Sequence, residues 1–579
     1  MTFEASLGAA APADASVAWS VSEPGGGTVS AAGAYVAPLA AGVFHVVATS
    51  LADSTKSATA TVTVLRTQAC AAEPLRSTGT VHYFCDCQTG AAAGCVAGSD
   101  GNAGTSPSAP KQKLSTAAAL FNSMPAGDTV ALCNGGAFGG FYAGSATHSA
   151  FNANCTPSST CDLRNYAAPW NTGSEGFPVV GPGSQYGITF DDIGGGRENG
   201  GYRVLNIDFD GASGFGIVFG HRVHDVDVCN VAIHNSAGGF TYGQSGESYN
   251  ITVRQSSIHD VAGQGVLEAC SNCVIDGNTF ANVGGPRAGS SPQQHAIYLG
   301  SDGTGTPDGM KVTNNEIHAI AGAGGPVAFV VHGKVTHLLV ENNVIYGAGD
   351  GYGLQIDQGG EGFPEGFDYA VVRRNQVFDA AGIGIQVDQC PHCLVEDNVV
   401  VMGGTGANTG IASGETSDCS GCSTNENVVY RNNTVFFPAG VAGTGLSLGG
   451  DGDTHVLTNN AVLKEGSGSL TCFRTPLPAA SYEAVSNNAC YGTSSWGTSL
   501  GTAAVSANPL FADPGGDDFS FPSSSPLVNA GTASATCTVQ GVASQPCFSP
   551  VAIGSFPWSA TATAQPRTDG LPDIGAYEE

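Results

Sequence analysis

An asparagine recurs in one short frame along the middle of the chain, and this repeat constrains the fold more than any other feature of the sequence. The frame reads apolar residue, two residues, Asn, one residue, apolar residue, as in 275–280 and 312–317. The seven intervals from 278 to 488 average 30 residues, a period that indicates a solenoid. Asn tolerates left-handed backbone, and stacked amides can hydrogen-bond from one turn to the next. The eight repeats carry Asn278, Asn315, Asn343, Asn375, Asn398, Asn433, Asn460 and Asn488.

A second repeated segment supports the same register. A short strand rich in Gly and apolar residues opens each coil, and in such a strand the second and fourth positions face the interior. Nearly all of these positions hold Ile, Val, Leu or Phe. The exceptions are Glu268 and Ser413, which we expect to line polar pockets or to mark a bulge. The segments are 216–219, 265–268, 296–299, 328–331, 353–356, 384–387, 410–413 and 445–448.

Together, the two columns resemble the asparagine ladder and stacked strands of right-handed parallel β-helices such as the pectate lyase family. The resemblance implies an all-β fold, a right-handed parallel β-helix of about ten coils. It also implies that a glycan binds along the outer face of the strands, as in the pectate lyase and polygalacturonase families.

Four regions follow one another along the chain. Residues 1–66 alternate apolar and polar residues between turn signals and resemble bacterial immunoglobulin-like domains, which implies a small N-terminal immunoglobulin-like β-sandwich acting as a spacer. Residues 67–180 are predicted to form the N-terminal cap and first coils, and 181–500 the parallel β-helix with its ladder. Residues 501–579 are predicted to be a C-terminal cap region. Through 508–511, 525–531 and 573–578 this region resembles the "choice-of-anchor" signature of bacterial surface β-helix proteins.

Charge and cysteine content restrict the partners and the compartment. The 579 residues include 19 Lys and Arg against 48 Asp and Glu, a net charge of −29, which disfavours nucleic acids and anionic membrane surfaces. No apolar run reaches the ~18 residues of a membrane-spanning helix. The 18 cysteines indicate an oxidising compartment. We therefore expect a secreted or cell-surface monomer, with an export signal that has been removed before Met1.

Polar residues gather at outward positions of the middle coils. Adjacent strands lie about 4.8 Å apart, so residues at equivalent positions should form rows. Longer coils have their additional residues at the ends of these strands, which predicts the walls of a groove. The first row is predicted to hold His332, Asp357 and Asp388, the second Tyr298, Gln355 and Gln386, with His295, Lys334 and Glu415 at the flanks.

Three chemistries fit these rows, and the sequence leaves them open. Asp357 and Asp388, about 5 Å apart, match the carboxylate spacing of a retaining glycosidase, and their repulsion would raise one pKa and supply an acid. Alternatively, the two carboxylates, with Glu415, bind Ca²⁺ through oxygen ligands and hold a uronate. In that case His332, Lys334 or Tyr298 would abstract the neighbouring carbon-bound proton. In the third, the row is an inert, solvated face.

The leading hypothesis is an extracellular enzyme that cleaves a polysaccharide or cell-surface glycan. A Ca²⁺-assisted lyase acting on a uronate-containing polymer is preferred, because an acidic groove needs a cation to hold an acidic glycan. Gln355, Gln386, His295 and Glu415 are the predicted substrate-binding residues. The alternatives are a glycoside hydrolase that uses the Asp pair and a non-catalytic adhesion or glycan-binding stalk protein.

Three cysteine pairs with CxxC spacing follow the site strands. Two such pairs in successive coils could hold zinc. Disulfides are favoured because the expected compartment is oxidising and the expected Cα separation suits them. The pairs are Cys270 and Cys273, Cys390 and Cys393, and Cys419 and Cys422.

Overall fold

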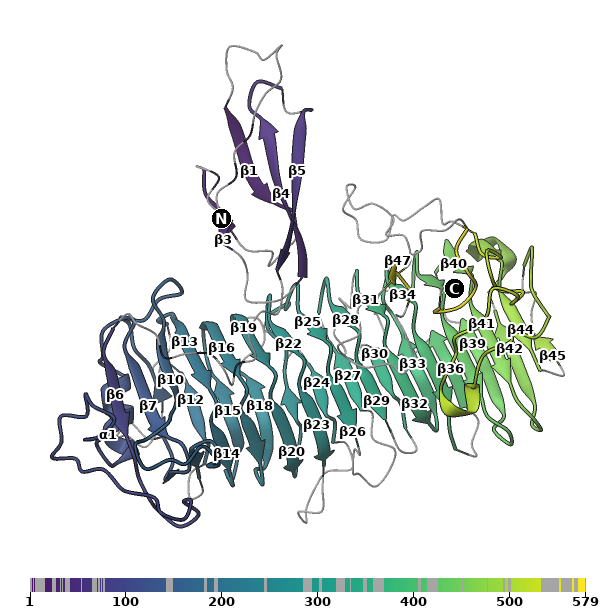
Figure 1. The fold of residues 1–579 in the computed structure, drawn as a ribbon. Coiled ribbons are helices and arrows are strands. Elements are labelled where there is room, and N and C mark those ends of the chain that lie inside the picture. The colour runs from purple at the N-terminus through teal and green to yellow at the C-terminus, as the bar shows by residue number, and fades with distance from the viewer. Residues whose placement is uncertain are drawn as a thin grey trace.

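The computed structural model of the chain is drawn in Figure 1. It describes residues 3, 5, 16–22, 28–31, 33, 35–36, 42–53, 55–64, 70, 73, 75, 79–141, 149–181, 185–191, 196–243, 247–284, 294–300, 305–318, 328–333, 335–346, 351–357, 369–404, 408–413, 425–448, 452–475, 477–492, 495–497, 501–532, 551–552, 565–566 and 571–577.

Three long parallel sheets form the body of the molecule, and each coil adds one strand to each sheet in turn (Figure 1). Sheet A contains β9 (Ser149–Ala150), β12 (Ile188–Phe190), β15 (Phe215–Phe219), β18 (Gly238–Tyr242), β21 (Val266–Leu267), β24 (Ile297–Leu299), β27 (Phe329–His332), β30 (Leu354–Asp357), β33 (Ile383–Val387), β36 (Asn408–Ser413), β39 (Gly443–Leu448), β42 (Leu470–Arg474) and β45 (Ser495–Gly497). Sheet B contains β6 (Val81–Phe84), β7 (Thr129–Cys133), β10 (Cys161–Tyr166), β13 (Asn199–Leu205), β16 (Val223–Cys229), β19 (Tyr249–Arg254), β22 (Val274–Asp276), β25 (Lys311–Thr313), β28 (Leu339–Glu341), β31 (Val371–Arg373), β34 (Leu394–Glu396), β37 (Val429–Arg431), β40 (His455–Thr458) and β43 (Tyr482–Ser486). Sheet C contains β8 (Ala137–Phe138), β11 (Val179–Val180), β14 (Asp208–Asp210), β17 (Ala232–His234), β20 (Ser257–Val261), β23 (Thr279–Val283), β26 (Glu316–His318), β29 (Val344–Tyr346), β32 (Gln376–Ala380), β35 (Val399–Met402), β38 (Thr434–Phe437), β41 (Ala461–Lys464) and β44 (Ala489–Tyr491).

The stack is longer than the ten or so coils expected from the sequence. Within the described residues, sheet B has 14 strands and sheets A and C have 13 each. The additional coils lie mainly toward the N-terminus, where β6 to β14 already join the sheets before the first ladder asparagine. These coils lack the Asn frame, so the repeat alone could not count them.

The asparagine ladder occupies the corner between sheets B and C. The amide of each ladder residue donates to the side-chain oxygen of the next, from Asn278 (3.0 Å to Asn315) through to Asn460 (3.1 Å to Asn488). The same oxygens also accept a backbone N–H of the preceding coil, as Asn343 Oδ1 does from Asn315 at 3.0 Å. The buried amides of the ladder are therefore satisfied from one coil to the next.

One detail of the ladder differs from the expectation. The left-handed backbone does not fall on the ladder asparagines but on the residue before each of them. Asn314 and Asn342 have φ angles of 58° and 61°, and Gly277 has 64° at the equivalent position. The corner thus uses two adjacent residues, one for the turn and one for the buried hydrogen bonds.

Apolar side chains of all three sheets fill the interior. Ile275, Val312 and Val340 form one fully buried column on sheet B. Glycines at the start of the sheet A strands allow close approach to sheet C. A Cβ at Gly353 would lie 2.3 Å from Val377, and one at Gly384 would lie 2.2 Å from Val400. The repeated Gly is therefore a packing requirement.

Segments outside the coils pack against the first coils and against the outer face of sheet C. Helix α1 (Leu114–Phe121) buries Leu114 and Phe121 against the first coils. At the other end, Phe519, Leu527 and Ile574 pack with apolar side chains on the outer face of sheet C. The amide of Asn432, beside the ladder, donates to the backbone oxygen of Asp573 at 3.0 Å. The C-terminal signature thus contributes packing and hydrogen bonds over the last coils.

Before the coils, β1 (Val17–Val21), β4 (Gly42–Ser50) and β5 (Ser57–Val64) form a three-stranded antiparallel sheet. Short strands β2 (Thr28–Val29) and β3 (Tyr35–Val36) pair with each other, as do β46 (Val551–Ala552) and β47 (Gln565–Pro566). Tyr35 and Val46 are buried in a small core of their own. No helix in the described part of the chain is long and apolar enough to cross a bilayer.

Candidate functional site

The predicted rows lie on sheet A, on strands β24, β27, β30 and β33 and the residue after β33. His332 is in register with Asp357, and Gln355 with Gln386. Ile356 pairs with Val387, so Asp388 follows in register beside Asp357. Tyr298 pairs with Val330, which separates it from Gln355 by one strand. The register of the coils therefore brings side chains from four successive coils onto one face.

A hydrogen-bonded trio forms the centre of the site. Nδ1 of His332 lies 2.6 Å from Oδ1 of Asp357, on the next strand. The amide of Gln355, on the same strand as Asp357, donates to the other carboxylate oxygen. Both oxygens of Asp357 are thus engaged, and the imidazole is held by one ring nitrogen. Within the described residues Nε2 of His332 makes no hydrogen bond, and the side chain is 24% exposed.

Aromatic rings flank the imidazole on the N-terminal side. The Tyr298 ring meets His332 nearly edge to face, with centroids 5.5 Å apart and an interplanar angle of 61°. His295 lies 5.5 Å from Tyr298 on the other side and is buried. Gln264 accepts the backbone N–H of His295 at 2.7 Å. His295 therefore supports Tyr298 at the edge of the site, three residues before it on the same chain segment.

The carboxylates are not a solvated face. Asp357 is 3% exposed and Asp388 is 1% exposed. Asp388 accepts a hydrogen bond from the amide of Gln386 and so repeats the Gln-x-Asp pairing of the preceding coil. Two buried carboxyl groups therefore lie on adjacent coils at this point of sheet A.

Tyr352 belongs to the same site, and the sequence reasoning missed it. Burial raises the pKa of its hydroxyl, and the negative charges of Asp357 and Asp388 raise it further. The phenol therefore keeps its proton at neutral pH. The signal was present in the sequence, because Tyr352 immediately precedes Gly353 just as His295 immediately precedes Ala296.

Several predicted features lie outside the described residues. Lys334, Glu415, Cys419 and Cys422 are among them, and so is most of the sequence expected to build the groove walls. Glu268 is described and corrects an expectation. It does not line an interior pocket but has a φ of 69° and is partly exposed, with its carboxylate beside Gly300 on the outer face.

Two of the CxxC pairs are disulfides, Cys270–Cys273 and Cys390–Cys393. They occupy equivalent corners after the site strands. Cys273 Sγ accepts the backbone N–H of Ile251, and Cys393 Sγ accepts that of Ala370, both at 3.3 Å. Zinc binding by these four cysteines is therefore not supported. Among the described residues, five further disulfides join Cys70–Cys229, Cys85–Cys133, Cys87–Cys95, Cys155–Cys161 and Cys472–Cys490.

Metal-ligating groups do not converge on the candidate site within the described residues. The one cluster of three there is Cys85, Cys87 and Cys95, and all three sulfurs are already in disulfides. His332, Asp357 and Asp388 do not form such a cluster of three within the described residues. Calcium binding at this pair stays a prediction.

Known proteins resemble this chain in fold. Residues 195–364 and 291–462 match the family model "Right handed beta helix region". No curated protein sequence matches the chain.

Among solved structures, the A-module of a mannuronan C-5 epimerase from Azotobacter vinelandii aligns at 14% identity over 66% of this chain and 91% of that chain, with a TM-score of 0.45. An alginate lyase from Paenibacillus sp. aligns at 14% identity over 64% and 97%, with a TM-score of 0.34. A pectate lyase aligns at 12% identity over 87% and 97%, with a TM-score of 0.35. The sheet topology and the family-model match together identify the fold as a right-handed parallel β-helix.

Proposed function

We propose that this chain is a polysaccharide-acting enzyme whose active site lies on the outer face of sheet A. The observation that supports it most is the 2.6 Å contact between His332 and Asp357, with Gln355 on the second carboxylate oxygen. A carboxylate that hydrogen-bonds to one imidazole nitrogen fixes the tautomer and orientation of the ring and leaves the other nitrogen as the proton acceptor. Such a pair is suited to general-base catalysis.

The preferred reaction is elimination from a uronate-containing polymer. His332 Nε2 takes the proton from the carbon next to the uronate carboxylate, and the electrons of that C–H bond form a C=C bond. The glycosidic C–O bond on the neighbouring carbon breaks, and its oxygen leaves with a proton. Tyr298 and Tyr352 are the phenols near the base that could supply this proton.

Calcium would supply electrostatic support for the substrate carboxylate if it bound at Asp357 and Asp388. Asp357 fits this role poorly, because His332 and Gln355 already engage both of its oxygens. Asp388 and Glu415 are the other candidate ligands in the sequence. No step of the proposed reaction is routed through the ion.

A glycoside hydrolase is the second candidate function. Asp357 and Asp388 stand on adjacent strands about 4.8 Å apart, close to the separation of a retaining pair. Both side chains are almost fully buried, so the two carboxyl groups lie side by side away from water. A binding-only stalk is the third possibility and predicts no turnover.

One experiment separates these possibilities. The full chain is incubated with polymannuronate, polygalacturonate and neutral glucans, and unsaturated uronates, new reducing ends and solvent-deuterium incorporation are followed together. Ultraviolet absorbance with reducing ends identifies a lyase, and reducing ends alone identify a hydrolase. Deuterium incorporation without cleavage identifies proton abstraction without elimination. Absence of all three signals on every polymer contradicts the proposal, and retention of full activity in Asp388→Asn removes Asp388 from the site.

A further inference from the structure

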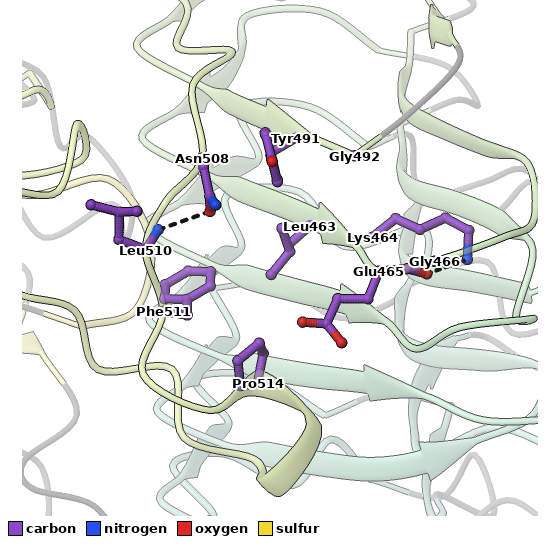
Figure 2. A pocket seen from close by; sticks show the side chains of 10 residues that line it. All are labelled: Leu463, Lys464, Glu465, Gly466, Tyr491, Gly492, Asn508, Leu510, Phe511 and Pro514. Atoms are coloured by element: carbon purple, nitrogen blue, oxygen red, sulfur yellow. Dashed lines mark hydrogen bonds between the residues drawn. The ribbon is translucent and has the colours of Figure 1, made fainter.

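A cavity of about 570 Å³ lies far along the stack, between the outer face of sheet C and the C-terminal segment that crosses it. In Figure 2, Leu463, Glu465 and Tyr491 approach it from the sheet, and Asn508, Phe511 and Pro514 from the facing segment. The cavity is on a different sheet from the His332 site. It is therefore independent of the proposed function.

The Asn508-Pro509-Leu510-Phe511 motif forms the facing wall. Pro509 is buried, and Phe511 packs edge to face on Phe519 with centroids 5.6 Å apart. These two residues are explained by packing. Asn508 is exposed, and its side-chain oxygen accepts the backbone N–H of Leu510 at 3.0 Å, which fixes the local turn. Leu510 is 41% exposed at the rim. The motif thus presents a side-chain amide and apolar surface to the cavity.

Glu465 is the one carboxylate among the residues that line the cavity. Glu465 is exposed, and within the described residues its carboxylate has no ion pair or hydrogen-bond partner. The adjacent Lys464 does not neutralise it, since its Nζ donates to the backbone oxygens of Val441 at 2.5 Å and Pro438 at 3.1 Å. Figure 2 shows the Lys464 side chain running away from the facing segment. An anionic ligand would meet an uncompensated carboxylate here.

A neutral sugar matches this surface. Its C–H faces can pack on Tyr491, Phe511 and Leu463, its hydroxyl hydrogens can donate to Glu465, and its hydroxyl oxygens can accept from the side-chain amide of Asn508. The volume lies in the range of small-molecule sites. We infer that this cavity is a saccharide-binding site for a neutral oligosaccharide, separate from the site on sheet A.

The test is calorimetric titration of the full chain with neutral tetrasaccharides of glucose, mannose, galactose and xylose, with tetragalacturonate and oligolysine as contrasts. We expect saturable binding of at least one neutral tetrasaccharide. Tyr491→Ala and Glu465→Gln should each weaken it about tenfold. Glu483→Gln, an exposed carboxylate on β43 of sheet B, is the matched control and should bind as the wild type does.

Three outcomes overturn the inference. The first is that no neutral tetrasaccharide binds. The second is that a neutral tetrasaccharide binds equally well to the wild type, Tyr491→Ala and Glu465→Gln. The third is that oligolysine binds, that Glu465→Gln abolishes this binding, and that neutral sugars do not bind. The last result would assign the cavity to a cationic peptide. His332 lies on sheet A, away from this cavity. His332→Gln should therefore leave neutral-sugar binding at the cavity intact, whether or not the chain is an enzyme.

Discussion

Nδ1 of His332 lies 2.6 Å from Oδ1 of Asp357, its register partner on the next strand of sheet A. The contact joins two coils that are 25 residues apart in sequence. Parallel pairing without a register shift holds the two side chains opposite each other. The β-helix thus acts as a rigid frame that brings the His–Asp pair together through the backbone register of its coils.

Gln355 should act as a positioning residue for this pair. Its amide donates to the second oxygen of Asp357, so Gln355→Leu frees the carboxylate to rotate away from His332. On the polymer that the wild type turns over, we expect kcat to fall about 10–100-fold with little change in KM. Steady-state kinetics measure both. An unchanged kcat, or a change confined to KM, would remove Gln355 from this role.

The buried ladder should be sensitive to a single deletion. Asn343→Ala removes an oxygen that accepts two hydrogen bonds from Asn315 and an amide that donates to Val312 and Asn375. Leaving these buried groups unpaired should cost about 2–4 kcal/mol. Denaturant unfolding followed by circular dichroism should show a lower midpoint. A midpoint equal to that of the wild type would mean that the ladder contributes little to stability.

At the adjacent Asn342, the effect of a substitution on stability should depend on how well the new residue tolerates a left-handed backbone. Its φ of 61° is a left-handed conformation, and Gly277 occupies the same position of an earlier coil. Asn342→Gly should therefore be tolerated to within about 1 kcal/mol, and Asn342→Val should destabilise by about 1–2 kcal/mol more. The two variants are compared by their unfolding midpoints. Equal midpoints would contradict the conformational argument.

A pH dependence of stability should arise at His234 on the outer face of sheet C. The hydrogen bond to Asp208, at 2.7 Å, is the main cause that raises the pKa of this imidazole, with smaller contributions from Asp208 and Asp210 charges. A raised folded-state pKa stabilises the protein below the unfolded value of about 6.5, and this stabilisation is lost as pH rises through the higher folded value. The effect should stay below about 1 kcal/mol, because the ring is only partly buried. Melting temperatures of wild type and His234→Gln should differ more at pH 5.5 than at pH 8.5, and the reverse order would contradict the assignment.

Sequence reasoning found the parts of the fold that repeat. The Asn frame and the Gly-rich strand column gave the coil register, and that register placed His332 beside Asp357 and Gln355 beside Gln386. A fixed position within a coil determines which face a side chain occupies. This is why residues from coils of unequal length could be aligned without coordinates.

Features that depend on neighbouring coils and distant segments were not predictable in this way. The near-complete burial of Asp357 and Asp388 is one such feature, because the register gives the face of a side chain but not its exposed fraction. A charged column on the outside of sheet B, where Glu396 contacts Arg431 at 2.8 Å, also went unnoticed. The charged residues of this column become neighbours only when the strands of sheet B are paired in their observed register. The left-handed turn was assigned to the wrong one of two adjacent residues, because the frame gives the corner but not its φ angles.

The central claim is that the His–Asp pair on sheet A performs chemistry, and a matched pair of histidines tests it most directly. His337 makes the same 2.6 Å contact, to Asp308, but lies in the turn before sheet B. The measurement is the turnover rate of His332→Gln and His337→Gln on the polymer that the wild type attacks. The account predicts that His332→Gln loses at least ~100-fold in rate and that His337→Gln retains wild-type turnover. Equal rates in the two variants would contradict it.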